Sequence, residues 1–338
     1  MICRSRESHD DGAALLIVLL LVSTLAALSV TVVQTIAASQ RMTGYSEARG
    51  QAAWYIQGAE QLAQVRLRQL YEMTEGRITR FTPALGIPFR FSIEGGEVRA
   101  RIEDGSNCFN LNSLAQPDES EDDEGAGATP QPAVDARKFY VELLKALGFP
   151  QGEANRLMST AADWLDADSN MRPLGAEAGF YAGLPEPRSI GNTFMVTPLE
   201  LLDVYGYTPE IYRQIAPYVC ARPGLQVGSF NVNTMTQRDA PLMVAVYNGQ
   251  ITLESMMAVM RQQSEIEHSD MEAFLSQATL ASIDPEQTVT SLLGLRSNYF
   301  RLSGEIVYLD SVSSYEAIFQ LGEAGQAVLL RRRLGVDE

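Results

Sequence analysis

The first hydrophobic pattern along the chain is an uninterrupted apolar run. From Ala13 to Gln40 the sequence carries no charge, and its few hydroxyl groups can bond back to helix carbonyls. At about 1.5 Å per residue, a helix from Ala13 to Val33 is roughly 30 Å long, the thickness of the hydrocarbon core of a bilayer. The run therefore predicts one membrane-spanning helix near the N-terminus.

The apolar positions then take a helical period. Six residues recur every three or four positions: Ala52, Ile56, Ala59, Ala63, Leu67 and Leu70. This spacing places them on one face of a helix. We expect one helix from Ala13 to about Glu72, whose second half packs on a soluble domain.

Strand patterns lie on both sides of a long helical block. Residues 87–104, IPFRFSIEGGEVRARIED, alternate apolar and polar positions around two glycines and predict a β-hairpin with a tight turn. β-branched and aromatic residues return in YFRLSGEIVYLD, SSYEAIFQL and AVLLRRRL, after about Leu295. This order predicts an α+β domain interrupted by a helical insertion.

Helix-end signals support the helical block from Val134 to about Leu280. DARKFYVELLKALG ends at Gly148, a natural helix C-cap. TPLELLDVYG begins with Thr197 as N-cap, Pro198 at the first helical position and Glu200 closing a capping box. Both segments are therefore expected to be helices.

The charge balance is strongly acidic. Among the 338 residues, 42 acidic side chains stand against 26 basic ones, and the formal net charge is -16. Nucleic acid is excluded as an expected partner, since binding it requires Lys and Arg to neutralise phosphates. A divalent cation or a basic protein surface fits better.

Two cysteines follow the apolar run. Cys108 and Cys220 are a candidate disulfide if this part of the chain is exported, although two sporadic cysteines can also stay free and buried. The sequence leaves both alternatives open.

The strongest chemical signal is the segment from Asp163 to Tyr181, DWLDADSNMRPLGAEAGFY. Its candidate oxygen ligands are Asp163, Asp166, Asp168, Asn170 and Glu177. The spacing by two resembles the start of a calcium-binding loop, and a set of hard oxygen ligands suits calcium better than magnesium. The EF-hand glycine is missing, because Met171 takes its place, so an acidic surface loop that caps helices is the alternative.

Little else predicts catalysis. His268 stands alone in SEIEHSD and is expected to be a solvated helix residue. The sequence has no nucleophile beside a histidine, phosphate-binding glycine loop or zinc spacing. Asp163 and Asp166 could form an acid/base pair, but the surrounding oxygen donors favour a structural cation. We therefore expect a protein that is not an enzyme.

The glycine before the apolar run has three interpretations. Gly12 can end a prepilin-type leader that is cut before the helix, the run can be a plain anchor, or a secretory signal can be cut before Ser39. The apolar stretch is longer than the usual 7 to 15 residues of a signal peptide.

Several stretches together resemble one family, the minor pseudopilin K of the type II secretion system. They are GAALLIVLLLVSTLAALSV, AAWYIQGAEQLA, DGSNCFNLNSL, AADWLDADSNMRPLGAEAGFY, TPLELLDVYG, FNVNT and LRSNYF. These stretches occur in the family's order and cover nearly the whole chain. The resemblance implies a long N-terminal helix plus an antiparallel sheet, as in pilins, with a large all-helical domain inserted between strands.

The resemblance also implies processing of the N-terminus. A membrane prepilin peptidase would cut between Gly12 and Ala13 and leave a methylated amine on Ala13. Most pilin-like subunits have glutamate at the fifth mature position, which is Ile17 here. An apolar residue is typical of the K subunit, because a subunit at the tip has no preceding amine to neutralise and a lone carboxylate in lipid is costly.

Family members bind calcium in the helical domain, which favours a metal site at the five oxygen ligands given above. The family usually reads GAED where this chain reads GAEA, so Ala178 removes one potential carboxylate ligand. The acidic SHDDG before the cut is also less basic than usual.

The expected function is that of a minor pseudopilin which forms the pseudopilus tip with minor pseudopilins I and J and supports secretion across the outer membrane. Further expected partners are other pseudopilus subunits and secreted exoproteins or the secretin. The expected location is the inner membrane, with a single span and a periplasmic domain. The alternatives are a minor pilin of a type IV pilus or DNA-uptake system, and a membrane-anchored calcium-binding module.

On this basis we divide the chain into six parts. They are a leader (1–12), the transmembrane half of the helix (13–40), the first part of the pilin-like core (41–115), an acidic linker (116–133), the inserted helical domain (134–285) and the C-terminal strands (286–338).

Overall fold

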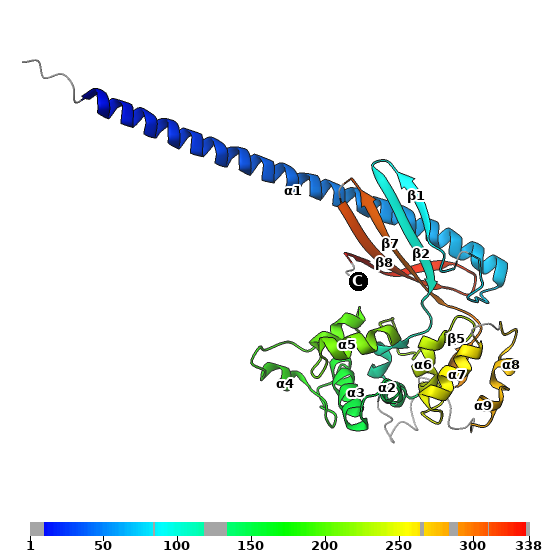
Figure 1. Cartoon of the computed structure of the whole chain (residues 1–338). Helices are drawn as coiled ribbons and strands as arrows, with labels where there is room; N and C mark the ends of the chain where they lie inside the picture. The colour runs from blue at the N-terminus through cyan, green and yellow to red at the C-terminus, as the bar shows by residue number, and fades with distance from the viewer. Residues whose placement is uncertain are drawn as a thin grey trace, which may run out of the picture.

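A computed structural model gives the fold. It describes residues 10–83, 85–117, 134–263, 267–283, 290–309 and 311–335. Most of the predicted leader and nearly all of the predicted acidic linker lie outside the described residues. The described part has the predicted α+β architecture (Figure 1).

One long helix, α1 (Asp10–Thr74), begins the described chain, as predicted. Its segment Ala13–Gly44 projects away from the rest of the molecule and is long and apolar enough to cross a membrane (Figure 1). No residue of its most apolar window is buried within the protein. A helix with leucine and valine exposed on all sides needs an apolar surrounding, which the hydrocarbon core of a membrane provides.

The second half of α1 packs on an antiparallel sheet. The strands are β1 (Phe89–Ile93), β2 (Gly96–Asp104), β7 (Tyr299–Tyr308), β8 (Ser311–Leu321) and β9 (Ala327–Leu334), in the order β1-β2-β7-β8-β9. The chain leaves this sheet after β2 and returns at β7. The helical part is therefore inserted between two neighbouring strands, as predicted.

The predicted periodicities explain this packing. All six apolar positions from Ala52 to Leu70 are buried, and they contact inward-facing residues of the sheet such as Val98, Leu302 and Ile306. The predicted hairpin is also present. Ile93 pairs with Gly96, and Gly95 adopts φ +82°, a conformation that glycine accepts without a steric penalty.

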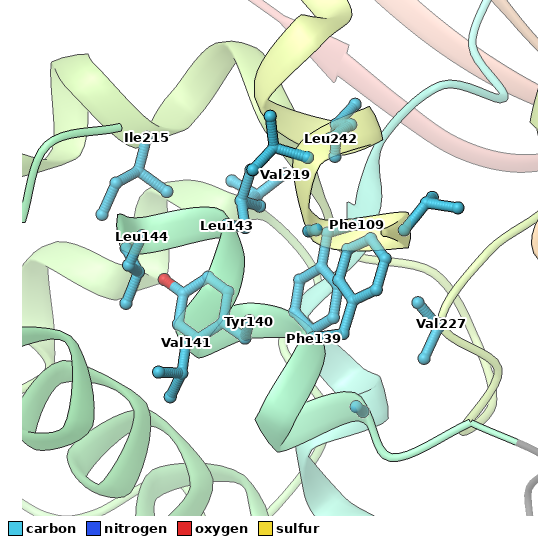
Figure 2. Packing of buried hydrophobic residues seen from close by; sticks show 14 of the residues in the cluster. Phe109, Phe139, Tyr140, Val141, Leu143, Leu144, Ile215, Val219, Val227 and Leu242 are labelled. Atoms are coloured by element: carbon cyan, nitrogen blue, oxygen red, sulfur yellow. The ribbon is translucent and has the colours of Figure 1, made fainter. Parts of the chain in front are cut away.

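The inserted domain consists mainly of short helices around a second core. Its α-helices are α2 (Ala136–Ala146), α3 (Gln151–Leu165), α4 (Ala178–Ala182), α5 (Pro209–Ile215), α6 (Ala240–Val246), α7 (Leu253–Gln263), α8 (Met271–Leu275) and α9 (Ala278–Ala281). Phe109, Phe139 and Tyr140 stack in its centre (Figure 2). Gly148 follows α2 with φ +95°, which agrees with the predicted helix end.

Some local predictions need correction. The capping box of Thr197 and Glu200 is present, but it begins a 3-10 helix, η2 (Pro198–Asp203), because the chain turns into an extended conformation at Val204. His268 is buried rather than solvated: its backbone exchanges hydrogen bonds with the Asn233 side chain, and its ring packs edge-on against Phe274.

Two short parallel strand pairs were not predicted. They are β3 (Phe109–Asn110) with β4 (Val219–Cys220), and β5 (Phe230–Asn231) with β6 (Leu293–Gly294). One apolar residue of each strand packs into the helical core, namely Phe109, Val219, Phe230 and Leu293. The core of the inserted domain thus begins before the predicted boundary at 115 and extends beyond the one at 285.

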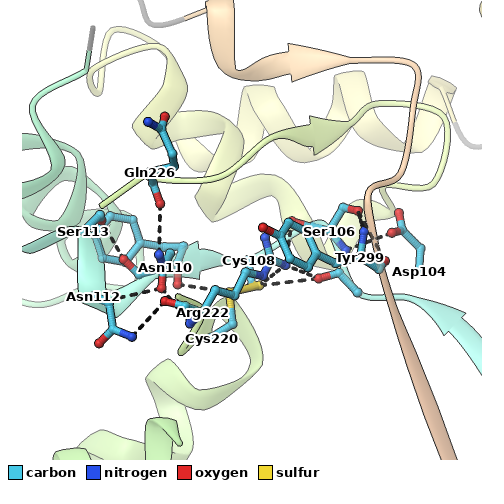
Figure 3. The surroundings of a disulfide bond; sticks show 12 residues. Asp104, Ser106, Cys108, Asn110, Asn112, Ser113, Cys220, Arg222, Gln226 and Tyr299 are labelled. Atoms are coloured by element: carbon cyan, nitrogen blue, oxygen red, sulfur yellow. Dashed lines mark hydrogen bonds between the residues drawn. A yellow bond between two sulfur atoms is a disulfide. The ribbon is translucent and has the colours of Figure 1, made fainter. Parts of the chain in front are cut away.

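A disulfide bond between Cys108 and Cys220 lies where the chain enters the inserted domain (Figure 3). Beside it, the buried Arg222 guanidinium donates hydrogen bonds to the carbonyls of Gly105 and Ser106 and lies over the Tyr299 ring at 3.9 Å. Burial lowers the pKa of Arg222 to about 10, so the side chain stays charged at neutral pH. This cluster ties the inserted domain to the sheet.

Candidate metal centre

Three acidic side chains meet at the end of α3. Asp163 lies in the last turn of α3, Asp166 is its C-cap, and Glu177 is the N-cap of α4. All three residues are buried, and Asp163 is completely inaccessible. The loop between the two helices therefore returns the third carboxylate to the first two.

The loop depends on a glycine at its return. A Cβ atom on Gly175 would lie less than 3.0 Å from the Asp163 carboxylate, so no larger residue fits without moving it. The preceding residue, Leu174, has φ +66°, a left-handed conformation that is uncommon for leucine. The loop is thus shaped to bring its backbone against a buried acid.

The geometry of the three carboxylates suits one hard cation. Each offers an oxygen atom, and these oxygens all lie within 4.8 Å of one another. Calcium binds oxygen ligands at about 2.3–2.6 Å, so ligands on opposite sides of one ion lie about 5 Å apart. The three oxygens can therefore share one calcium ion.

Two of the buried oxygens have no hydrogen-bond partner among the residues that the structure describes. These are Oδ1 of Asp166 and Oε1 of Glu177. A buried acceptor without a partner is costly, so such atoms usually bind water or an ion. The donor set consists of hard oxygens and fits calcium.

The electrostatics indicate the same need for a positive partner. Burial raises the pKa of Asp166, an effect that the Arg172 hydrogen bond partly offsets, and burial also raises the pKa of Glu177. Neighbouring acids add to both shifts. Because each pKa is higher in the folded than in the unfolded state, ionisation of these groups lowers stability as pH rises through the folded pKa. A bound cation would remove this penalty.

The other two predicted ligands lie outside the three-carboxylate cluster. Asp168 and Asn170 are exposed, and the Asn170 backbone N–H donates to Asp168 Oδ1 at 2.7 Å. The charge of Asp168 still raises the pKa of Asp166 and of Glu177. The structure thus brings three of the five predicted ligands together and leaves two on the adjoining loop.

Arg172 is a further residue of the centre, and the sequence pattern did not predict its role. Its Nη1 donates to Asp163 Oδ1 at 2.9 Å and also to Asp166 Oδ2. Only its position within the acidic segment indicated a role in the centre. Which carboxylates the side chain contacts depends on how the loop folds. The centre therefore contains an internal positive charge.

The predicted processing residues lie at the start of α1. Gly12 and Ala13 fall in its first turn, and the Ile17 side chain is exposed within the apolar segment. The apolar side chains of this segment are therefore available for contact with lipid or with another protein.

Comparison with known proteins gives consistent matches. The family description "Type II secretion system (T2SS), protein K" matches residues 107–224 and again residues 230–296. The chain is 31% identical to the type II secretion system protein K of Pectobacterium carotovorum, over 97% of each chain. It is 32% identical to that of Klebsiella pneumoniae, over 82% of each chain.

The fold also resembles a solved structure. A chain in the crystal structure of the GspK-GspI-GspJ complex from the Type 2 Secretion System of enterotoxigenic Escherichia coli superposes with a TM-score of 0.70. The match covers 88% of this chain and 99% of the other at 24% identity, so it establishes a shared fold.

Proposed function

The chain belongs to the type II secretion system protein K family, and we propose that it acts as a minor pseudopilin at the tip of the pseudopilus. The observation that carries this proposal is the match to the protein K family across the inserted domain. The same chain has a long N-terminal helix with an apolar first half and a second half that packs on the sheet. Its role is assembly rather than catalysis.

The proposed partners are minor pseudopilins I and J. The solved relative belongs to a complex with two such subunits, and the shared fold supports the same assembly here. An exposed Trp54 and Val65 on α1 offer apolar contacts for partner helices. Recovery of the full chain together with both subunits from host membranes tests this assignment.

The proposed maturation is cleavage between Gly12 and Ala13, followed by methylation of the new amine. The prepilin peptidase would thereby remove a short leader and leave the apolar segment of α1 in the inner membrane. Ile17 suits a subunit with no preceding neighbour, since a lone carboxylate in lipid would be costly. The sheet and the inserted domain would then lie in the periplasm.

The inserted domain would cap the tip and face other components. Residues 106–296 contain 25 acidic and 11 basic side chains, so this domain carries almost all of the chain's net negative charge. A surface of this kind favours basic partners, including parts of secreted exoproteins or of the secretin. Its bulk would block addition of further subunits above it.

We propose a structural calcium ion in the inserted domain. Asp163, Asp166 and Glu177 would hold it, and Asp168 and Asn170 lie exposed on the adjoining loop. Calcium would neutralise the clustered carboxylates and fix the loop between α3 and α4. The unpartnered oxygens of Asp166 and Glu177 support this assignment.

The double variant Asp166→Asn/Glu177→Gln tests the calcium site. Calcium at 100 times its Kd is expected to stabilise the parent by about 2.7 kcal/mol and this variant much less, because two of the three ligand charges are gone. Thermal unfolding of the full chain in detergent, with calcium or with a chelator, measures the difference.

The matched control is Asp203→Asn/Glu186→Gln, which removes two exposed acids from the same domain. It should keep the calcium effect of the parent. Equal calcium effects in all three proteins would contradict the site.

A further inference from the structure

Arg172 already occupies the acidic centre as a positive charge. Its side chain is only 13% exposed, and one nitrogen, Nη1, donates to both Asp163 and Asp166. The backbone N–H of the same residue also points to the Asp163 carboxylate, at 3.3 Å from Oδ2. A single nitrogen thus bridges the two aspartates, which is the role that a metal ion would have.

The guanidinium and a calcium ion need the same space. An ion bound to Asp163 Oδ1 and Asp166 Oδ2 would lie about 2.3–2.6 Å from both oxygens, between the two carboxylates. Nη1 donates to these same two oxygens. An ion that binds them, together with the unpartnered Asp166 Oδ1 and Glu177 Oε1, would have to replace Nη1 there. Two positive charges so close would also repel each other strongly in a buried site. Both cannot hold this position together.

The position of Arg172 in the loop allows its guanidinium to leave the centre. Arg172 lies between Met171 and Pro173, which are both exposed, whereas Asp163 and Asp166 are fixed by α3 and its C-cap. The long arginine side chain can therefore turn to solvent while the carboxylates stay in place.

We propose that Arg172 is the resident counter-charge of the centre and that a divalent cation displaces its guanidinium on binding. This inference rests on the calcium site proposed above. Without the ion, Arg172 would hold the loop against the repulsion of the three acids. With the ion, release of the ion pairs would oppose binding and weaken the affinity.

The variant Arg172→Gln tests the competition. Glutamine keeps a hydrogen-bonding amide without the charge, so calcium should bind at least about tenfold more tightly than in the parent. The ion-free variant should melt at a lower temperature than the ion-free parent, and saturating calcium should close most of that gap. Titration calorimetry with calcium chloride and thermal unfolding of the full chain in detergent give both readouts.

Arg213→Gln is the matched control, because it removes one highly exposed positive charge from the same domain. It should leave both readouts unchanged. Comparable tightening in this control would overturn the inference, since general charge rather than position would then explain the effect.

The remaining outcomes separate the inference from the calcium site itself. A parent that binds calcium, with Arg172→Gln binding equally or more weakly, overturns the competition and keeps the site. If only the Arg172→Gln variant binds calcium, the competition is supported, and the proposal that the parent binds calcium is overturned. Absence of calcium binding in both proteins overturns both proposals.

Discussion

Replacing Cys108 and Cys220 together with serine is expected to lower the free energy of unfolding by about 4 kcal/mol. The disulfide joins residues 112 positions apart, and a crosslink across so long a loop strongly restricts the unfolded chain. The loss should be concentrated in the inserted domain, because the bond joins the residue before β3 to β4, at the entrance to this domain.

Denaturant unfolding of the full chain in detergent measures this effect. Reduction of the parent with dithiothreitol should reproduce the loss, whereas the same treatment should leave the double serine variant unchanged. A difference below about 1 kcal/mol between parent and variant would contradict the structural role of the bond.

The second large effect is expected at Gly304, in the middle of β7. This residue pairs with Ala100 on one side and Tyr315 on the other. A Cβ atom here would lie less than 3.0 Å from the Arg99 carbonyl oxygen, so the strands would have to separate. Gly304→Ala is expected to lower the free energy of unfolding by about 2–3 kcal/mol through overpacking.

Gly58→Ala is the matched control in the same half of the fold. In the described part of the chain, no atom lies within 4 Å of a Cβ atom at Gly58 in α1, so alanine should instead raise stability by about 0.5–1 kcal/mol. Denaturant unfolding compares the two variants. Similar changes in both would show that the close approach between β2 and β7 does not limit stability.

The elements that could be predicted are those whose signal lies in nearby residues. The three-and-four spacing of Ala52 to Leu70 predicts the packed face of α1, and alternation around Gly95 predicts the hairpin. Both patterns reflect direct contact of one face with the core. The order of these signals also predicts the insertion between β2 and β7.

The features that were missed depend on contacts between distant residues. The pairing of β3 with β4 joins segments more than 100 residues apart and involves only two residues in each strand. Local sequence contains no periodicity for such a pair. The burial of His268 was missed for the same reason, because its partner Asn233 is 35 positions away in the chain.

The metal centre was predictable in composition but not in geometry. Spacing by two identifies Asp166 and Asp168 as candidate ligands, yet only Asp166 is buried beside Asp163 and Glu177. The entry of Arg172 depends on how the loop folds back over the end of α3. Sequence spacing alone does not determine that path.

Native mass spectrometry of the full chain, purified in detergent from host membranes, tests the central claim most directly. We expect a complex with minor pseudopilins I and J in which this chain has the mass of residues 13–338 plus one methyl group. A chain recovered alone with the mass of residues 1–338 would contradict its role as a processed subunit of the pseudopilus tip.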